Sequence, residues 1–113
     1  MKKKKLFANY NFEFDKNETK VISNFCKQAI QQMQADDKFQ RDIAAFTSIR
    51  EKLAEGNGTV KLTKDEKTRL VLQLKSNRDN LEARLKKSNF FTRWLYRSMF
   101  NQYNNLIENH FSD

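Results

Sequence analysis

The 113-residue chain contains no proline, and its only two glycines, Gly56 and Gly58, stand one residue apart. Proline and glycine are the residues that most often form tight turns, and an all-β domain of this length would need many such turns. Their near absence therefore predicts a few long helices. It also predicts one strong internal break, with Gly56 at the end of a helix and Asn57-Gly58 in a turn.

Two short stretches alternate between apolar and polar residues, as the strands of a half-buried sheet do. The first covers residues about 4–14 and is rich in aromatic side chains, with Phe12 and Phe14 on its apolar side. The second is the stretch TVKLT, residues 59–63. Because a single strand leaves its backbone hydrogen-bonding groups without partners, we expect the two stretches to pair as a ribbon.

Elsewhere, apolar residues recur at helical spacing in four stretches, which predicts four amphipathic helices. The candidate N-cap residues before these helices are Asp15 or Asn17, Asp36 or Asp37, Thr63 in a capping box with Glu66, and Ser88 or Asn89. Since no glycine or proline interrupts the chain near residue 36, one long bent helix is an alternative to the first two. The short connection between the last two helices predicts an antiparallel hairpin.

These elements predict an α+β fold, mainly α, in which four amphipathic helices and a small two-stranded ribbon follow in the order β-α-α-β-α-α. The length fits a single domain over residues 1–113. Ten phenylalanines supply large apolar areas, so we expect a folded core although 32% of the residues are charged. The lysine-rich residues 1–5 are expected to form a flexible basic arm.

Groups that carry catalysis are scarce in the sequence. Cys26 is the only cysteine and His110 the only histidine, so no disulfide can form within the chain, and we expect Cys26 to be a buried small hydrophobe. The glycines are not followed by the Lys-Ser/Thr pair of a phosphate-binding loop. Asp36, Asp37 and Asp42 could bind a hard cation, but helix capping explains them more simply. We predict a non-enzymatic protein without metal or cofactor.

The beginning of the chain bears on its cellular setting. Its lysines are not followed by an apolar run, so they do not form a signal peptide. No stretch approaches the ~18 apolar residues that a membrane-spanning helix needs. Together with the lone cysteine, this pattern favours a reducing, cytoplasmic setting.

The formal net charge is +8, and the positive excess is concentrated in two segments. Residues 1–20 carry six lysines against three acids, and residues 59–89 carry nine Lys and Arg against four acids. Segregated positive charge favours nucleic acid, an acidic protein or an anionic membrane surface as a partner. Plain solubility is the alternative explanation.

The stretch KKSNFFTRWLYRSMF, residues 86–100, combines cations with large apolar side chains. Its helical spacing assigns four residues to the core, namely Phe91, Leu95, Met99 and Phe100. Trp94 lies about 100° around the helix from Leu95, on the side of Phe90 and several cations. This predicts a surface suited to stacking or cation–π contact. In the alternative, Phe90 and Trp94 close over the first two helices.

Two functional hypotheses follow from these patterns. The first is a small basic nucleic-acid-binding accessory or regulatory protein, and the second is an inhibitor or adaptor that docks a basic surface on an acidic protein partner. Residues 59–74 (TVKLTKDEKTRLVLQL) resemble, in general character, small proteins carried by phages and mobile elements, which implies such a setting. An apolar patch left exposed by four short helices would also favour a homodimer. The predicted contact residues for nucleic acid or partner are Lys64, Lys67, Lys75, Arg78, Arg84, Lys86, Lys87, Phe90, Arg93, Trp94 and Arg97.

Overall fold

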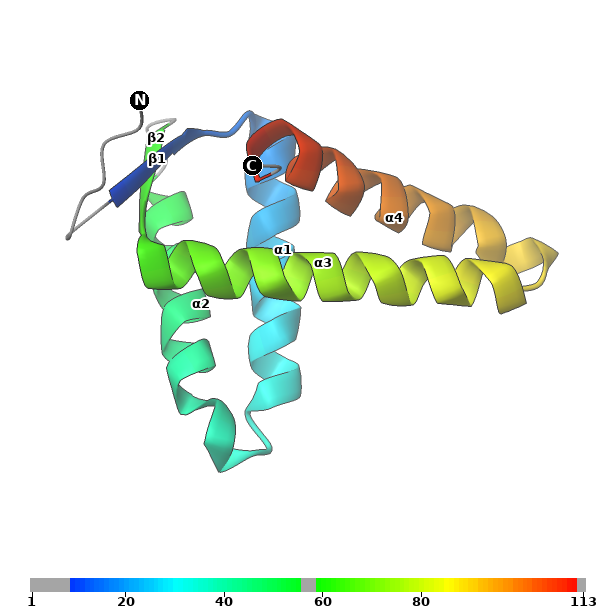
Figure 1. Ribbon diagram of the computed structural model, residues 1–113, viewed down its shortest axis with the longest axis horizontal. Coiled ribbons are helices and arrows are strands. Elements are labelled where there is room, and N and C mark those ends of the chain that lie inside the picture. Colours follow the sequence, from blue (N-terminus) through cyan, green and yellow to red (C-terminus); the bar gives the residue numbers. More distant parts are fainter. Residues whose placement is uncertain (1–8, 56–58, 112–113) are drawn as a thin grey trace, which may run out of the picture. The chain divides into compact units, whose positions relative to one another are not determined.

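The computed structural model describes residues 9–55 and 59–111, and its elements follow in the order β-α-α-β-α-α (Figure 1). Four helices and a two-stranded antiparallel sheet confirm the predicted α+β class, mainly α. The predicted basic arm at residues 1–5 and the predicted turn at residues 56–58 lie outside the described residues. The chain divides into two compact units, Met1–Arg69 (unit 1) and Leu70–Asp113 (unit 2). A single domain over residues 1–113 stays a prediction.

The sheet of unit 1 pairs β1 (Asn9–Glu13) with β2 (Thr59–Thr63) in antiparallel register, with Tyr10 opposite Leu62 and Phe12 opposite Val60. The predicted ribbon is therefore confirmed where the structure describes it, and β2 has the predicted bounds. Alternation fixes the two faces of the ribbon, because successive side chains of a strand point to opposite sides. Phe12, Val60 and Leu62 are buried accordingly.

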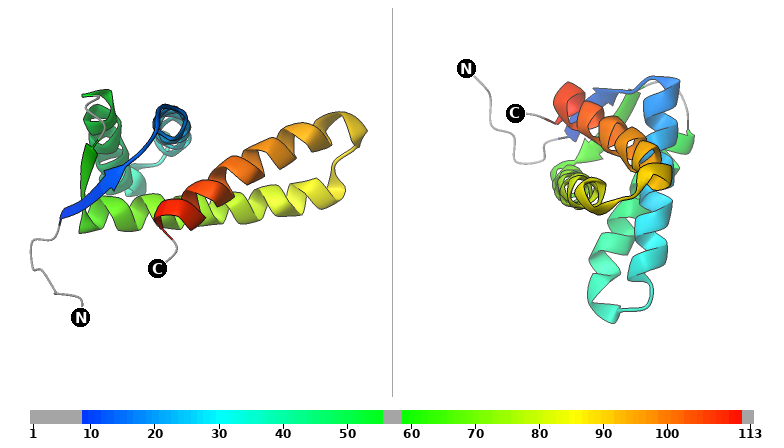
Figure 2. Two further views of the ribbon diagram at one scale, coloured as in Figure 1. Left: turned by 90° about the horizontal axis from the view of Figure 1, so that it is seen from above. Right: turned by 90° about the vertical axis from the view of Figure 1, so that its right-hand side faces the viewer.

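Helices α1 (Lys16–Met33) and α2 (Gln40–Ala54) run side by side in opposite directions (Figures 1 and 2). Asp15 caps α1 in a capping box with Glu18. The backbone turns extended at Asp36, whose side chain caps the short 3₁₀ turn η1 (Asp37–Phe39) by accepting from the backbone N–H of Lys38. Two separate helices are thus confirmed. The alternative of one long bent helix is wrong, because the extended backbone at Asp36 interrupts the helical conformation between α1 and α2.

The core of unit 1 lies between α1, α2 and the ribbon. Phe25 of α1 meets Phe46 of α2 edge to face, with ring centroids 6.5 Å apart, an arrangement that aromatic rings favour. Cys26 is fully buried, as predicted, and its burial raises the pKa of the thiol to about 12 against the opposing effect of Arg50. The Cys26 thiol is therefore protonated and chemically inert at neutral pH.

A buried carboxylate joins the three elements at the start of α3 (Lys64–Lys87). Glu66 accepts hydrogen bonds from Ser48 Oγ (2.6 Å) and Lys52 Nζ (2.7 Å) of α2, and from the backbone N–H of Thr63 (2.9 Å). The Glu66 N–H donates in return to Thr63 Oγ1 (3.0 Å), which confirms the predicted capping box. Burial alone would raise the pKa of Glu66, but the hydrogen bonds outweigh it and hold the pKa below its ordinary value.

Unit 2 is a helical hairpin, in which α3 and α4 (Phe90–His110) are joined by Ser88 and Asn89 (Figures 1 and 2). Asn89 caps α4, since its Oδ1 accepts from the N–H groups of Phe91 and Thr92. The antiparallel hairpin is confirmed. Its buried residues all lie away from the turn; they are Leu70, Leu74, Leu81, Tyr103, Leu106, Ile107 and Phe111.

One part of the predicted core is wrong. Phe91 and Leu95 are 77% and 44% exposed, although helical spacing assigned both to the core. The physical reason is that unit 2 contains only two helices, and two helices cover one side of each other and leave the rest of their surfaces open. Periodicity identifies the apolar side of a helix, but it does not say whether a further element covers that side.

We expect Phe46→Ala to lower the free energy of unfolding by about 3–5 kcal/mol, because Phe46 is fully buried and its removal leaves a cavity. The matched control is Phe90→Ala, the same change at a ring that is 84% exposed, which should shift the free energy by no more than about 0.5 kcal/mol. Urea unfolding followed by circular dichroism measures both values. Equal losses in the two variants would contradict the described core.

We also expect the Glu66 carboxylate to stabilise the fold in a pH-dependent way. The pKa of Glu66 is lower in the folded chain than in the unfolded chain. Its contribution to the free energy of unfolding is therefore complete above the ordinary glutamate pKa. That contribution is lost as the pH falls below about 5 and passes through the lowered pKa of the folded chain. Glu66→Gln should cost about 1–3 kcal/mol at neutral pH, and the difference from wild type should shrink in acid, where both side chains are neutral. Urea unfolding at a series of pH values measures this, with the exposed Glu51→Gln as control; a difference that stays constant down to acid pH would refute it.

Candidate functional site

Four large apolar side chains are exposed together at the turn end of the α3–α4 hairpin. Phe90, Phe91, Trp94 and Leu95 are 84%, 77%, 68% and 44% exposed. Helical residues four apart are neighbours, so Phe90 lies beside Trp94, and Phe91 lies beside Leu95. The rings of Phe90 and Phe91 meet edge to face with centroids 5.8 Å apart. Single exposed apolar residues are ordinary, but four in two helical turns form a patch of the kind that marks a contact surface.

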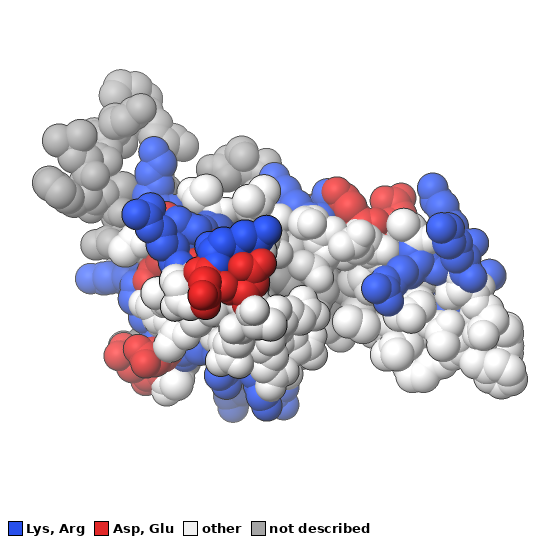
Figure 3. Space-filling view, turned by 90° about the horizontal axis from the view of Figure 1, so that it is seen from below, with Lys and Arg blue, Asp and Glu red and all other residues white. Residues whose placement is uncertain are grey.

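Exposed cations border this patch on both helices. Arg84, Lys86 and Lys87 come from the end of α3, and Arg93 and Arg97 come from the first two turns of α4. We call the surface of these five cations and four apolar side chains the hairpin tip. Figure 3 shows Lys and Arg gathered over this end of the hairpin, next to uncharged surface.

Between the acidic residues Glu82 and Glu108, no acid offsets the positive charge of the hairpin tip along the chain. From Ala83 to Ile107 the sequence contains five Lys and Arg and no Asp or Glu. Within the described residues, Arg84, Lys86, Lys87 and Arg97 form no ion pair. Surface charges without partners keep their full attraction for an anion, limited only by salt screening. The hairpin tip is therefore a positive surface that carries exposed rings.

The local sequence explains how the tip is built. The Asn89 side chain accepts from the N–H groups of Phe91 and Thr92 at 3.0 and 3.1 Å, which satisfies donors that would otherwise be free at the start of α4. The Arg93 side chain donates to the carbonyl of Ser88 at 3.3 Å and so helps to hold the turn. Because the helix end is capped internally, attraction for an anion at the tip comes from side-chain cations rather than from backbone donors.

A shallow hollow of about 300 Å³ adjoins the tip within unit 2. Two of its lining residues, Arg84 and Lys87, are tip cations, and Tyr96 of α4 contributes a half-exposed ring. Asn80, Ala83 and Ser88 complete the lining. The hollow combines cations, hydrogen-bonding groups and an aromatic ring, which suits an anionic and partly flat ligand.

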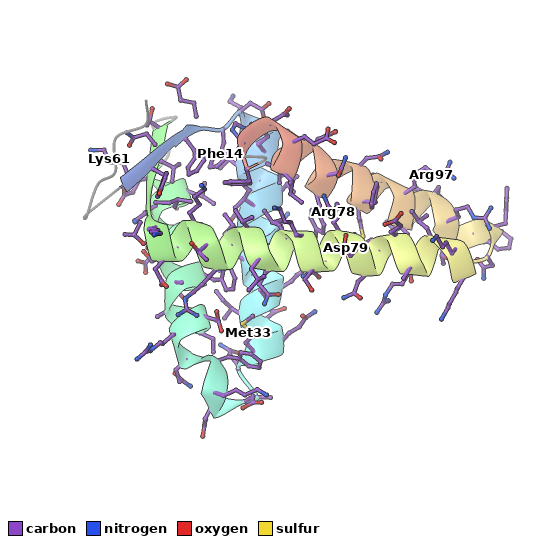
Figure 4. The ribbon with its side chains drawn as sticks, in the orientation of Figure 1. Phe14, Met33, Lys61, Arg78, Asp79 and Arg97 are labelled. Atoms are coloured by element: carbon purple, nitrogen blue, oxygen red, sulfur yellow. The ribbon has the colours of Figure 1, made fainter. Side chains whose placement is uncertain are left out.

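The other predicted contact residues lie elsewhere on α3. Lys64 and Lys67 belong to unit 1, and the Lys67 ammonium lies 4.5 Å from the centre of the Tyr10 ring. Arg78 lies between α3 and α4, where it pairs with Asp79 at 3.2 Å and donates to Asn104 at 3.3 Å (Figure 4). Lys75 is half-buried. The structure thus brings together the predicted residues from Arg84 to Arg97, whereas Arg78 serves the hairpin itself.

Other groups with chemical potential have structural partners. Asp36 caps η1, and Asp42 binds Arg69 at 2.8 Å. In the part of the chain that the structure describes, no three His, Cys, Asp or Glu side chains come together as metal ligands. Over the same residues, no helix has both the length and the apolar character needed to cross a membrane.

Phe91 and Leu95 are the tip residues that the sequence prediction assigned to the core instead of the contact surface. A signal for them was present, because the acid-free run from Ala83 to Ile107 surrounds both residues. A core helix of a globular protein carries charges of both signs on its outer face. A run that carries cations and no acids therefore indicates a positively charged surface. Apolar residues inside such a run are candidates for contact with a ligand.

Comparison of the chain with protein-family models, with curated proteins and with solved structures gave no match. The fold and the hairpin tip define a small basic α+β protein with an exposed cationic and aromatic surface. The chemistry of that surface is the basis for its functional interpretation.

We expect Trp94→Ala to fold normally, with a free energy of unfolding within about 0.5 kcal/mol of wild type, because the ring is 68% exposed. Leu106→Ala, a truncation on the same helix at a residue that is only 2% exposed, should cost about 2–5 kcal/mol. Urea unfolding monitored by circular dichroism compares them. A loss of several kcal/mol in Trp94→Ala would place the ring in the core and remove it from the contact surface.

Proposed function

We propose that this chain is a small, non-enzymatic, nucleic-acid-binding protein of accessory or regulatory type, and that it binds through the hairpin tip. The observation that carries the proposal is the coincidence of five exposed cations and exposed aromatic rings in a segment without acids. Nucleic acids combine closely spaced phosphate charges with flat aromatic bases. The hairpin tip has a complementary group for each of these features.

The positive charges provide the part of the binding that does not depend on sequence. Lys and Arg side chains that neutralise phosphates release condensed counterions, so binding weakens as salt increases. Arg84, Lys86, Lys87 and Arg97 are suited to this role because no carboxylate of the described residues pairs with them. Arg69, in contrast, already pairs with Asp42 and Asp65.

An acidic protein partner would be attracted by the same cations of the hairpin tip. An experiment can distinguish this partner from a nucleic acid. A protein carries carboxylates but no nucleobases. Its carboxylates would attract the cations of the tip, and the aromatic rings would contact apolar side chains of that protein. Nucleic acid is the better fit because it offers phosphates and π faces at repeated, regular intervals. An absence of DNA and RNA binding at low salt would favour the acidic protein partner.

We expect the triple variant Arg84→Gln, Lys86→Gln, Lys87→Gln to bind mixed-sequence DNA more weakly and with a smaller salt dependence. If all three side chains contact phosphates, the slope of log affinity against log salt should decrease in magnitude by about 2 on a single strand. Fluorescence anisotropy of a labelled oligonucleotide at several salt concentrations measures the slope. Circular dichroism confirms that the variant is folded.

The matched control removes the same charge from another part of the chain. Lys16, Lys20 and Lys27 are exposed on α1 in unit 1, so their triple substitution by Gln lowers the net charge equally. If the hairpin tip alone contacts the phosphates, no counterion release is lost in this control, and it should keep nearly the wild-type slope. Equal losses in both triple variants would show a diffuse charge effect and would overturn the hairpin tip as the site.

A further inference from the structure

We infer that the nucleic acid bound by the hairpin tip is single-stranded, with its bases stacked on Phe90 and Trp94 and its phosphates contacted by Arg93 and Arg97. This inference rests on the proposed function and specifies the class of nucleic acid. The single-strand inference can be tested separately from the proposed function. A protein can bind the phosphates of a duplex without any stacking on bases, so stacking distinguishes the two.

The exposure of the rings is the first argument for a single strand. Phe90 and Trp94 are 84% and 68% exposed, so most of each aromatic surface is open to a ligand. In a duplex the bases already stack on one another, and a protein meets only their edges and the phosphates. In a single strand the base faces are available, and proteins without sequence preference use aromatic side chains to stack on them.

The second argument is the arrangement of the groups along α4. Phe90 and Trp94 are four residues apart, as are Arg93 and Arg97, so each pair lies one turn apart with a rise of about 6 Å. The two pairs form neighbouring rows along the same helix, because Trp94 directly follows Arg93. A strand that runs along α4 can therefore place bases on the row of rings and phosphates on the row of guanidinium groups.

The exposed surface of α4 continues from the rings into polar side chains rather than apolar ones. Ser98, Asn101, Gln102 and Asn105 are exposed and follow Trp94 at spacings of three and four residues, on the same side of the helix. Hydroxyl and amide groups can hydrogen-bond to base edges. A helix that lies on a membrane surface would instead continue its apolar face and would place Lys and Arg on the opposite face.

Charge disfavours a contact between the tips of two copies of the chain. Two tips brought together would face each other with cations and no acids, since the segment from Ala83 to Ile107 contains no Asp or Glu. Like charges across an interface are unfavourable. An occupant that is anionic and has flat apolar parts would match both the cations and the exposed rings, and a single-stranded nucleic acid has both features.

Trp94 is the only tryptophan in the chain, so its fluorescence reports directly on the proposed contact. The full chain is titrated with an oligothymidylate and with a mixed-sequence duplex of equal length at moderate salt. We expect the single strand to bind at least about 10-fold more tightly than the duplex and to quench Trp94, because only the single strand offers base faces to the ring. Anisotropy of the labelled oligonucleotide gives the affinity independently of the tryptophan.

Substitutions then separate stacking from charge. Phe90→Ala and Trp94→Ala should each weaken single-strand binding about 5- to 150-fold and should leave the salt slope unchanged, while Trp94→Phe should largely restore the affinity. Leu72→Ala is the matched control, since it removes an apolar side chain that is 65% exposed on α3 away from the turn. It should bind like wild type.

Each alternative outcome has a distinct meaning. Duplex binding as tight as single-strand binding, with unchanged Trp94 fluorescence, would overturn the single-strand inference and leave the proposed function intact. Absence of binding to both DNA forms and to a single-stranded RNA of equal length at low salt would overturn the proposed function as well. Quenching of Trp94 by vesicles rich in phosphatidylserine, without DNA binding, would assign the tip to an anionic membrane surface and would overturn both.

Discussion

The buried carboxylate of Glu66 determines how the elements of unit 1 are joined. It accepts hydrogen bonds from Ser48, Lys52 and the backbone of Thr63, so one side chain connects α2, the end of β2 and the beginning of α3. A buried charge is costly unless such partners are present. Because all three partners are needed together, β2 must end and α3 must begin at one defined residue.

Local features of this fold could be predicted from the sequence because their interactions join residues close in the chain. The capping box of Thr63 and Glu66, the cap at Asn89 and the alternation of β2 all depend on partners within about four residues. The contacts of Glu66 with Ser48 and Lys52 could not be predicted in the same way. They join residues 18 and 14 positions apart, and only the packing of α2 against the start of α3 brings them together.

The candidate site shows the same division between local pattern and tertiary context. Arg78 and Lys87 look alike in the sequence, since both are cations of one helix. The structure separates them, because Arg78 meets Asp79 and Asn104 whereas Lys87 has no ion-pair partner among the described residues. Phe91 shows the converse, because its spacing suggests a core residue and its position beside the turn leaves it exposed. Sequence patterns identify which chemistry is available, and packing decides which part of it remains open to a ligand.

The first turns of α4 differ from the rest of the helix in the burial of their side chains. None of residues 90–102 is buried, and the first buried residue of α4 is Tyr103. The start of α4 is therefore held by the Asn89 cap and by Arg93 on the Ser88 carbonyl rather than by packing. Side chains that contribute little to folding can be chosen for contact without loss of stability. The Asn89 cap thus satisfies the first N–H groups of α4 while the side chains of the tip stay open to a ligand.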